Sequence, residues 1–92
     1  MIRKRERLEI IHDILVAIKD KRETRPTHIL YKSNLSHQML TEYMNELIGK
    51  NFIEEKISKD GKKTYALKQK GFDYLRDYES IKSFMESYGL VE

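Results

Sequence analysis

Histidine can bind a metal ion or transfer a proton, and a serine beside a suitable base can act as a nucleophile. The three histidines, His12, His28 and His37, have no metal-ligand spacing, and the sequence contains no cysteine to join them. Ser36 directly precedes His37, but neighbouring residues on a helix do not face one another, and no carboxylate is placed to orient the imidazole. The four glycines form no phosphate-binding loop. The sequence therefore predicts that the protein is not an enzyme and uses no metal and no cofactor.

A second kind of chemistry, hydrogen bonding to base edges, fits the polar residues of segment 36–49. Its apolar residues recur with helical spacing and are expected to face a core: Leu40, Tyr43, Met44, Leu47 and Ile48. Asparagine and glutamine on the opposite face can each pair with adenine through two hydrogen bonds. We therefore expect a base-reading face formed by Ser36, His37, Gln38, Thr41 and Asn45. The alternative is an ordinary solvated helix face, which Glu42 and Glu46 favour because carboxylates repel phosphates.

Lysines surround an Asp60-Gly61 pair, which is typical of a tight turn between two strands. Ammonium groups at the tip of such a hairpin can contact phosphates beside a DNA groove, and they position a protein without reading sequence. The residues expected to do so are Lys56, Lys59, Lys62 and Lys63. The alternative is that lysines on edge strands prevent aggregation between sheets. Near the start of the chain, either a basic arm or a solvated terminus is formed by Arg3, Lys4, Arg5 and Arg7.

The elements that would position these side chains follow from the apolar periodicity. Helical spacing predicts four helices, over residues 5–21, 26–33, 36–49 and 69–88. Ser36 is a good N-cap for the third of them. The period becomes extended over residues 52–57 and 62–67, which predicts a hairpin between the third and the fourth helix. The order helix, helix, helix, hairpin, helix predicts a mainly α (α+β) fold whose second and third helices have helix-turn-helix spacing.

The charge distribution favours a polyanion as partner. The chain of 92 residues is short enough for one domain, and its net charge of +3 is uneven. Residues 1–35 hold nine Lys/Arg and five Asp/Glu, whereas residues 72–92 hold two and five. A positive body with a negative tail indicates that the body binds the polyanion, and a merely solvated surface is the alternative. No apolar run approaches the ~18 residues of a membrane span, and Glu6 interrupts any signal-like start, so we expect a cytoplasmic protein.

The last predicted helix carries a repeating apolar face. Phe72 and Leu75 are expected to pack back onto the domain. Five further residues have the 4, 3, 4, 3 spacing of a coiled-coil seam and predict a homodimer interface: Tyr74, Tyr78, Ile81, Met85 and Tyr88. An antiparallel pairing is favoured, because the acidic tail would bring like charges together in a parallel pair. The alternative is a helix that folds back over its own domain.

Three stretches, residues 7–18, 35–53 and 65–75, resemble the small archaeal winged-helix DNA-binding proteins that carry a C-terminal dimerisation helix. The last stretch is the most specific, because in this group the second wing strand leads through a Lys-Gly pair, here Lys70-Gly71, into the final helix. Lys68 stands where the group usually has a capping hydroxyl. The resemblance implies a winged helix-turn-helix DNA-binding domain over residues 1–71 and a dimerisation helix over residues 72–92. By analogy, the DNA backbone is contacted by Arg25, Tyr31 and Lys32.

Residues and resemblance together predict a homodimer that binds double-stranded DNA in the cytoplasm and is associated with the nucleoid. It acts either as a transcriptional regulator at chosen operators or as an architectural protein. The alternative from another class is a protein interaction module, in which the polar face of the third helix contacts a protein. The two classes differ in salt dependence, because DNA binding weakens steeply as salt is added.

Overall fold

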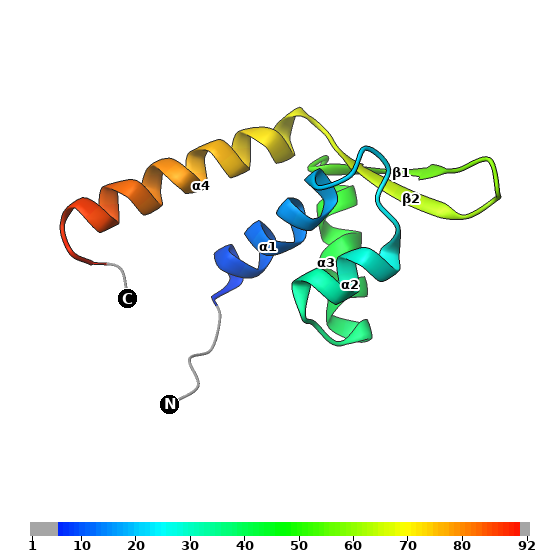
Figure 1. The fold of residues 1–92 in the computed structure, drawn as a ribbon, viewed down its shortest axis with the longest axis horizontal. Coiled ribbons are helices and arrows are strands. Elements are labelled where there is room, and N and C mark those ends of the chain that lie inside the picture. The colour runs from blue at the N-terminus through cyan, green and yellow to red at the C-terminus, as the bar shows by residue number, and fades with distance from the viewer. Residues whose placement is uncertain (1–5, 91–92) are drawn as a thin grey trace.

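The computed structural model describes residues 6–90, which form four helices and one β-hairpin (Figure 1). The elements follow in the order α1 (Arg7–Lys19), α2 (Pro26–Ser33), α3 (His37–Gly49), β1 (Ile53–Ile57), β2 (Lys63–Leu67) and α4 (Gln69–Ser87). This order confirms the mainly α (α+β) class predicted from the sequence. None of the described helices is long and apolar enough to cross a membrane.

The core is built around α1, which packs against α2, β2 and α4. Ile14, Leu15 and Ile18 of α1 are fully buried, together with Ile29 of α2. One buried stripe along the helix is what its apolar periodicity predicts. Leu8 in the first turn lies outside this stripe, with 58 % of its surface exposed.

A three-residue turn joins α2 to α3. Asn34 ends α2 with a left-handed φ of 53°, and its N–H donates to the carbonyl of Leu30. Ser36 then caps α3, because its side-chain oxygen accepts a hydrogen bond from the N–H of Met39 at 3.2 Å. The predicted N-cap of the third helix is therefore confirmed.

β1 and β2 pair antiparallel from Ile53 opposite Leu67 onward, and the free end of the hairpin extends away from the helices (Figure 1). In the loop between them, the N–H of Gly61 donates to the carbonyl of Ser58 at 2.9 Å. Gly61 has a φ of 79°, a left-handed conformation that glycine adopts without steric penalty. The turn predicted at Asp60-Gly61 is confirmed.

Thr24, between α1 and α2, adds a third backbone segment beside the hairpin. It exchanges two backbone hydrogen bonds with Tyr65 of β2, at 3.0 and 2.8 Å. Its buried hydroxyl donates to the carbonyl of Ile18 at 2.7 Å. These bonds fix the connection to both α1 and β2, and they place the start of α2 beside the hairpin.

The first turn of α4 makes a close backbone contact with the segment that precedes β1. A Cβ added at Gly71 would lie 2.5 Å from the carbonyl oxygen of Phe52, so glycine is required there, and this is a physical reason for the Lys-Gly pair. Lys68 is the N-cap and makes no side-chain capping bond. The prediction that Phe72 and Leu75 both pack onto the domain is right only for Leu75. Phe72 is 45 % exposed because the domain covers only the face of α4 that carries Gly71 and Leu75.

Candidate nucleic-acid interface

α3 presents two chemically distinct faces. Leu40, Met44 and Leu47 are buried in the core, each with 7 % or less of its surface exposed. Tyr43 and Ile48 are half-buried at the edge of this face. The opposite face is exposed, and it carries the residues of the predicted base-reading set that belong to the helix: His37, Gln38, Thr41 and Asn45.

Two hydroxyl groups of the predicted base-reading set already bond within α3. The Ser36 hydroxyl caps the helix, and the Thr41 hydroxyl donates to the carbonyl of His37 at 2.9 Å. Their remaining lone pairs can still accept hydrogen bonds. Within residues 6–90, the side-chain amides of Gln38 and Asn45 have no hydrogen-bond partner. These two amides therefore keep their full hydrogen-bonding capacity for a ligand.

An ion-pair cluster compensates one of the two carboxylates on α3. Glu46 accepts hydrogen bonds from Lys50, at 2.7 Å, and from Arg7, and these bonds lower the pKa of its carboxyl. The Arg7 guanidinium also lies 5.6 Å from the ring centroid of Tyr43. The charge of Glu46 is therefore partly neutralised, and it repels a polyanion less than its sequence position suggests. Arg7 lies against α3 rather than in a free arm. The rest of the predicted arm lies outside the described residues: Arg3, Lys4 and Arg5.

The four lysines of the hairpin divide into a paired and an unpaired group. Lys56 and Lys63 lie next to glutamates of β1, with N–O distances of 3.1 and 3.9 Å. Lys59 and Lys62 lie in the exposed loop, and no carboxylate of the described chain is within ion-pair distance of either ammonium group. Of the four hairpin lysines, Lys59 and Lys62 at the tip are therefore the most available to an anion.

The three residues assigned to the DNA backbone by analogy lie at opposite ends of α2. Arg25 is its N-cap, and its guanidinium lies 2.8 Å from the carboxylate of Asp60 in the hairpin loop. Tyr31 and Lys32 are exposed in the last turn, and Tyr31 has 81 % of its surface accessible. The structure therefore groups Arg25 with the hairpin and keeps Tyr31 and Lys32 together at the other end.

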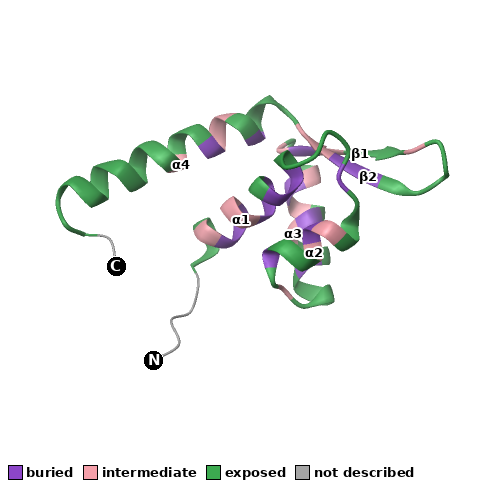
Figure 2. Ribbon diagram, viewed as in Figure 1, coloured by how far each residue is buried: buried purple, intermediate pink, exposed green. Residues whose placement is uncertain are grey.

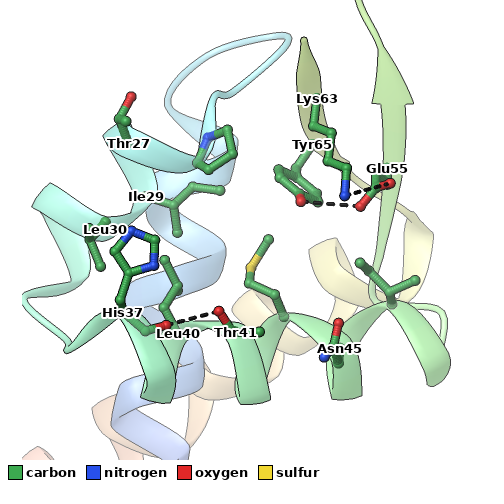
Figure 3. A pocket seen from close by; sticks show the side chains of 13 residues that line it. Thr27, Ile29, Leu30, His37, Leu40, Thr41, Asn45, Glu55, Lys63 and Tyr65 are labelled. Carbon is green, nitrogen blue, oxygen red and sulfur yellow. Dashed lines mark hydrogen bonds and ion pairs between the residues drawn. The ribbon is translucent and has the colours of Figure 1, made fainter.

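A cleft of about 280 Å³ separates α2 and α3 from the hairpin (Figure 3). Glu55, Lys63 and Tyr65 reach it from the hairpin, and the Tyr65 hydroxyl donates to Glu55 at 3.2 Å. Burial and the Glu55 carboxylate raise the pKa of Tyr65. No three histidine, aspartate or glutamate side chains of the described chain are grouped to hold a metal ion. The cleft brings the hairpin together with three predicted base-reading residues of α3, namely His37, Thr41 and Asn45.

The second half of α4 exposes an apolar stripe. All described residues from 79 to 90 are exposed (Figure 2). They include Ile81, Met85 and Tyr88 of the predicted dimer seam, which are 62, 37 and 69 % exposed. Phe84, 61 % exposed and with its ring centroid 5.1 Å from that of Tyr88, belongs to the same stripe and was missed by the heptad spacing. Its separation of three residues from Ile81 and four from Tyr88 is the signal that identifies it.

The first two residues of the predicted seam contact α1 of the same chain. The Tyr74 hydroxyl donates to the carbonyl of Leu8 at 2.7 Å. The Tyr78 ring stacks on the imidazole of His12 with a centroid distance of 4.2 Å. Both tyrosines are half-buried, so this part of the seam attaches α4 to its own domain.

The short turn between α2 and α3, the exposed polar face of α3 and the hairpin that follows define a winged helix-turn-helix protein. A sequence family described as winged helix-turn-helix matches residues 4–86, and the chain belongs to this family. The chain is also similar to the crystal structure of Sso10a-2, a DNA-binding protein from Sulfolobus solfataricus. That similarity has a TM-score of 0.77 at 21 % identity, and it covers 91 % of this chain and 85 % of the other. No curated protein matches the sequence. The resemblance to small archaeal winged-helix proteins is confirmed.

Proposed function

We propose that the protein binds double-stranded DNA as a homodimer, with α3 in the major groove and the hairpin against the adjacent backbone. The observation that carries the proposal is the exposed polar face of α3, which borders the same cleft as Lys63 of the hairpin. A helix with free amides can read base edges while cations beside it contact phosphates. The similar protein from Sulfolobus is a DNA-binding protein, which supports the same function for this chain.

Base reading is assigned to the exposed face of α3. Gln38 and Asn45 pair with adenine, because each amide offers one donor edge and one acceptor edge. Thr41 offers a methyl group for contact with thymine and a lone pair for a donor. Ser36 and His37 lie at the N-terminal end of α3, the part of a recognition helix that comes nearest to the bases.

Phosphate binding is assigned to the hairpin tip and to the end of α2. Lys59 and Lys62 contribute most, because neither ammonium group must leave a carboxylate of the described chain. Lys56 and Lys63 contribute less, because each must give up its ion pair with a neighbouring glutamate in order to bind a phosphate. The remaining backbone contacts are made by Tyr31 and Lys32.

Dimerisation is assigned to the second half of α4. Ile81, Phe84, Met85 and Tyr88 form an apolar stripe, and a second copy of the stripe covers it. Tyr74 and Tyr78 border this interface while holding α4 against α1. Antiparallel pairing keeps the acidic tails apart and places the two domains at opposite ends, where they meet two sites on one duplex. We assign the protein to transcription regulation in the cytoplasm, at the nucleoid.

Selection of binding sites from random duplex DNA tests this function. A regulator enriches a defined motif, and an architectural protein binds without one. For a selected site we expect Asn45→Ala to lose about 1–3 kcal/mol of discrimination at one base pair. Ser80→Ala, an exposed change on α4, is the control and should keep the motif. A wild-type protein with no affinity for any duplex at low salt would contradict the proposal.

A further inference from the structure

The tip of the hairpin contains an acid at the place where the proposed function puts DNA phosphates. Asp60 lies in the exposed loop between Lys59 and Lys62. On charge alone, a carboxylate at this position lowers the local positive potential and weakens the binding of a polyanion. The contacts of Asp60 point to a different role.

The Asp60 carboxylate accepts three hydrogen bonds. The Ser58 hydroxyl and the Lys62 backbone N–H, the latter at 3.2 Å, donate to Oδ1, and the Arg25 guanidinium donates to Oδ2 at 2.8 Å. These donors, the Ser58 hydroxyl first among them, hold the pKa of Asp60 well below its usual range, so the carboxyl is ionised at neutral pH. Two of the bonds organise the turn itself. The third connects the turn to the start of α2.

Arg25 extends toward the loop from a rigid part of the fold. It is the N-cap of α2, and it directly follows Thr24, which is fully buried and joined to Tyr65 by two backbone hydrogen bonds. The residue pairs of the hairpin end at Ile57 and Lys63, so the loop lies beyond the strand ladder. The Arg25 guanidinium therefore ties this loop to the helices.

We propose that Arg25 and Asp60 form a brace that fixes the hairpin tip relative to α3. The brace lets Lys59 and Lys62 meet phosphates in the same docking position in which Asn45 meets a base edge. Arg25 and Asp60 are then positioning residues rather than phosphate ligands. A tip without the brace has to be ordered during binding, and this ordering lowers the affinity. The inference rests on the proposed binding of DNA.

Two changes of equal charge on the same hairpin test the brace. Asp60→Asn removes the negative charge that faces Arg25 but keeps a side-chain oxygen for Ser58 and for the Lys62 N–H. Glu54→Gln changes the net charge equally, and its ion-pair partner is Lys56 rather than Arg25. Charge alone predicts that both variants bind duplex DNA more tightly than the wild type.

The brace predicts opposite signs for the two variants. Glu54→Gln should bind more tightly, and Asp60→Asn should bind about two- to fivefold more weakly, the range that an exposed ion pair supplies. An Asp60→Asn variant that binds as well as or better than the wild type overturns the proposal.

Arg25→Gln separates the brace from a direct phosphate contact. If Arg25 acts through Asp60, this change weakens wild-type binding but adds no comparable loss in the Asp60→Asn background. If Arg25 binds a phosphate itself, the loss is equal in both backgrounds, and the brace is wrong.

Backbone NMR relaxation tests the brace without DNA. The amides of Gly61 and Lys62 should gain amplitude in Asp60→Asn and in Arg25→Gln, and they should keep the wild-type amplitude in Glu54→Gln. Unchanged motion in the first two variants refutes the brace alone. A wild-type protein that binds no duplex, but whose tip loosens in those variants, refutes the proposed function alone.

Discussion

Replacing Ile81 and Met85 by glutamate is expected to make the protein monomeric without unfolding it. Both side chains lie in the second half of α4 and are 62 and 37 % exposed in the single chain. A glutamate at either position stays in water in the monomer. In a dimer it is forced into an apolar interface, where an unpaired carboxylate is strongly unfavourable. The double substitution therefore acts on assembly and leaves the fold intact.

The size of the effect follows from the surface that the stripe exposes. Ile81, Phe84, Met85 and Tyr88 expose between 37 and 69 % of their surfaces. If association buries about half of each side chain, the two copies gain roughly 6–12 kcal/mol, at about 1.5–3 kcal/mol for each fully buried side chain. Low estimates of the free-energy cost of association are about 4 kcal/mol. Subtracting this cost from the upper estimate of the gain, about 12 kcal/mol, leaves a binding free energy of about 8 kcal/mol, which corresponds to a dissociation constant of about 1 μM. Losing two of the four side chains halves the gain and moves dissociation beyond about 1 mM.

Sedimentation velocity over about 1 to 100 μM protein measures this difference directly. The wild type should be dimeric at the upper concentrations, and the double variant should be monomeric throughout with an unchanged far-UV circular dichroism spectrum. Phe72→Glu is the matched control, because Phe72 is an exposed apolar residue on α4 outside the stripe, and this variant should stay dimeric. A monomeric wild type at about 100 μM, or a double variant that remains dimeric, refutes the assignment.

Three further predictions concern the scaffold. Gly71→Ala should lose about 1–3 kcal/mol of unfolding free energy in urea, because its Cβ would lie 2.5 Å from the Phe52 carbonyl oxygen. Gly49→Ala, with nothing within 4 Å, should be neutral or gain up to about 1 kcal/mol, and equal effects would contradict the close contact. Leu47→Ala should lose about 2–5 kcal/mol, whereas Asn45→Ala should stay within about 0.5 kcal/mol, and similar melting of the two would reverse our assignment of faces. Hydrogen bonds from Lys50 and Arg7 lower the pKa of Glu46 below its ordinary value near 4.5, so ionised Glu46 stabilises the fold above that pH and the contribution is lost as the pH falls through the lowered pKa. The stability difference between wild type and Glu46→Gln should therefore shrink from about pH 6 to about pH 3, and a constant difference would show that the ion pairs do not matter.

The fold could be predicted because its determinants are local in sequence. The 4, 3 spacing of Leu40, Met44 and Leu47 determines which face of α3 is buried, and Ser36 marks where that helix begins. Asp60-Gly61 likewise marks the turn, since glycine adopts the left-handed φ that this turn requires without steric penalty. Periodicity and turn chemistry are short-range signals, so they can be recognised in the sequence without knowledge of tertiary contacts.

The parts that could not be predicted depend on contacts between distant segments. A heptad spacing does not distinguish a tyrosine that meets a second copy from one that meets α1, and Tyr74 and Tyr78 meet α1. The pairing of Arg25 with Asp60 joins residues 35 positions apart, so the sequence near either residue does not indicate its partner. Phe72 was assigned to the core by its apolar character, but only the tertiary position of α1 decides which face of α4 is covered.

The salt dependence of the binding constant tests whether α3 and the hairpin bind duplex DNA. About four phosphate contacts for each chain predict a slope of about −3.6 for log K against log salt, at about 0.9 for each contact. Lys59→Ala with Lys62→Ala should reduce the slope to about −1.8, while Arg76→Ala with Lys82→Ala, an equal loss of charge on α4, should leave it unchanged. An affinity that does not respond to salt, or a slope that is insensitive to the hairpin lysines, would contradict DNA binding through the hairpin.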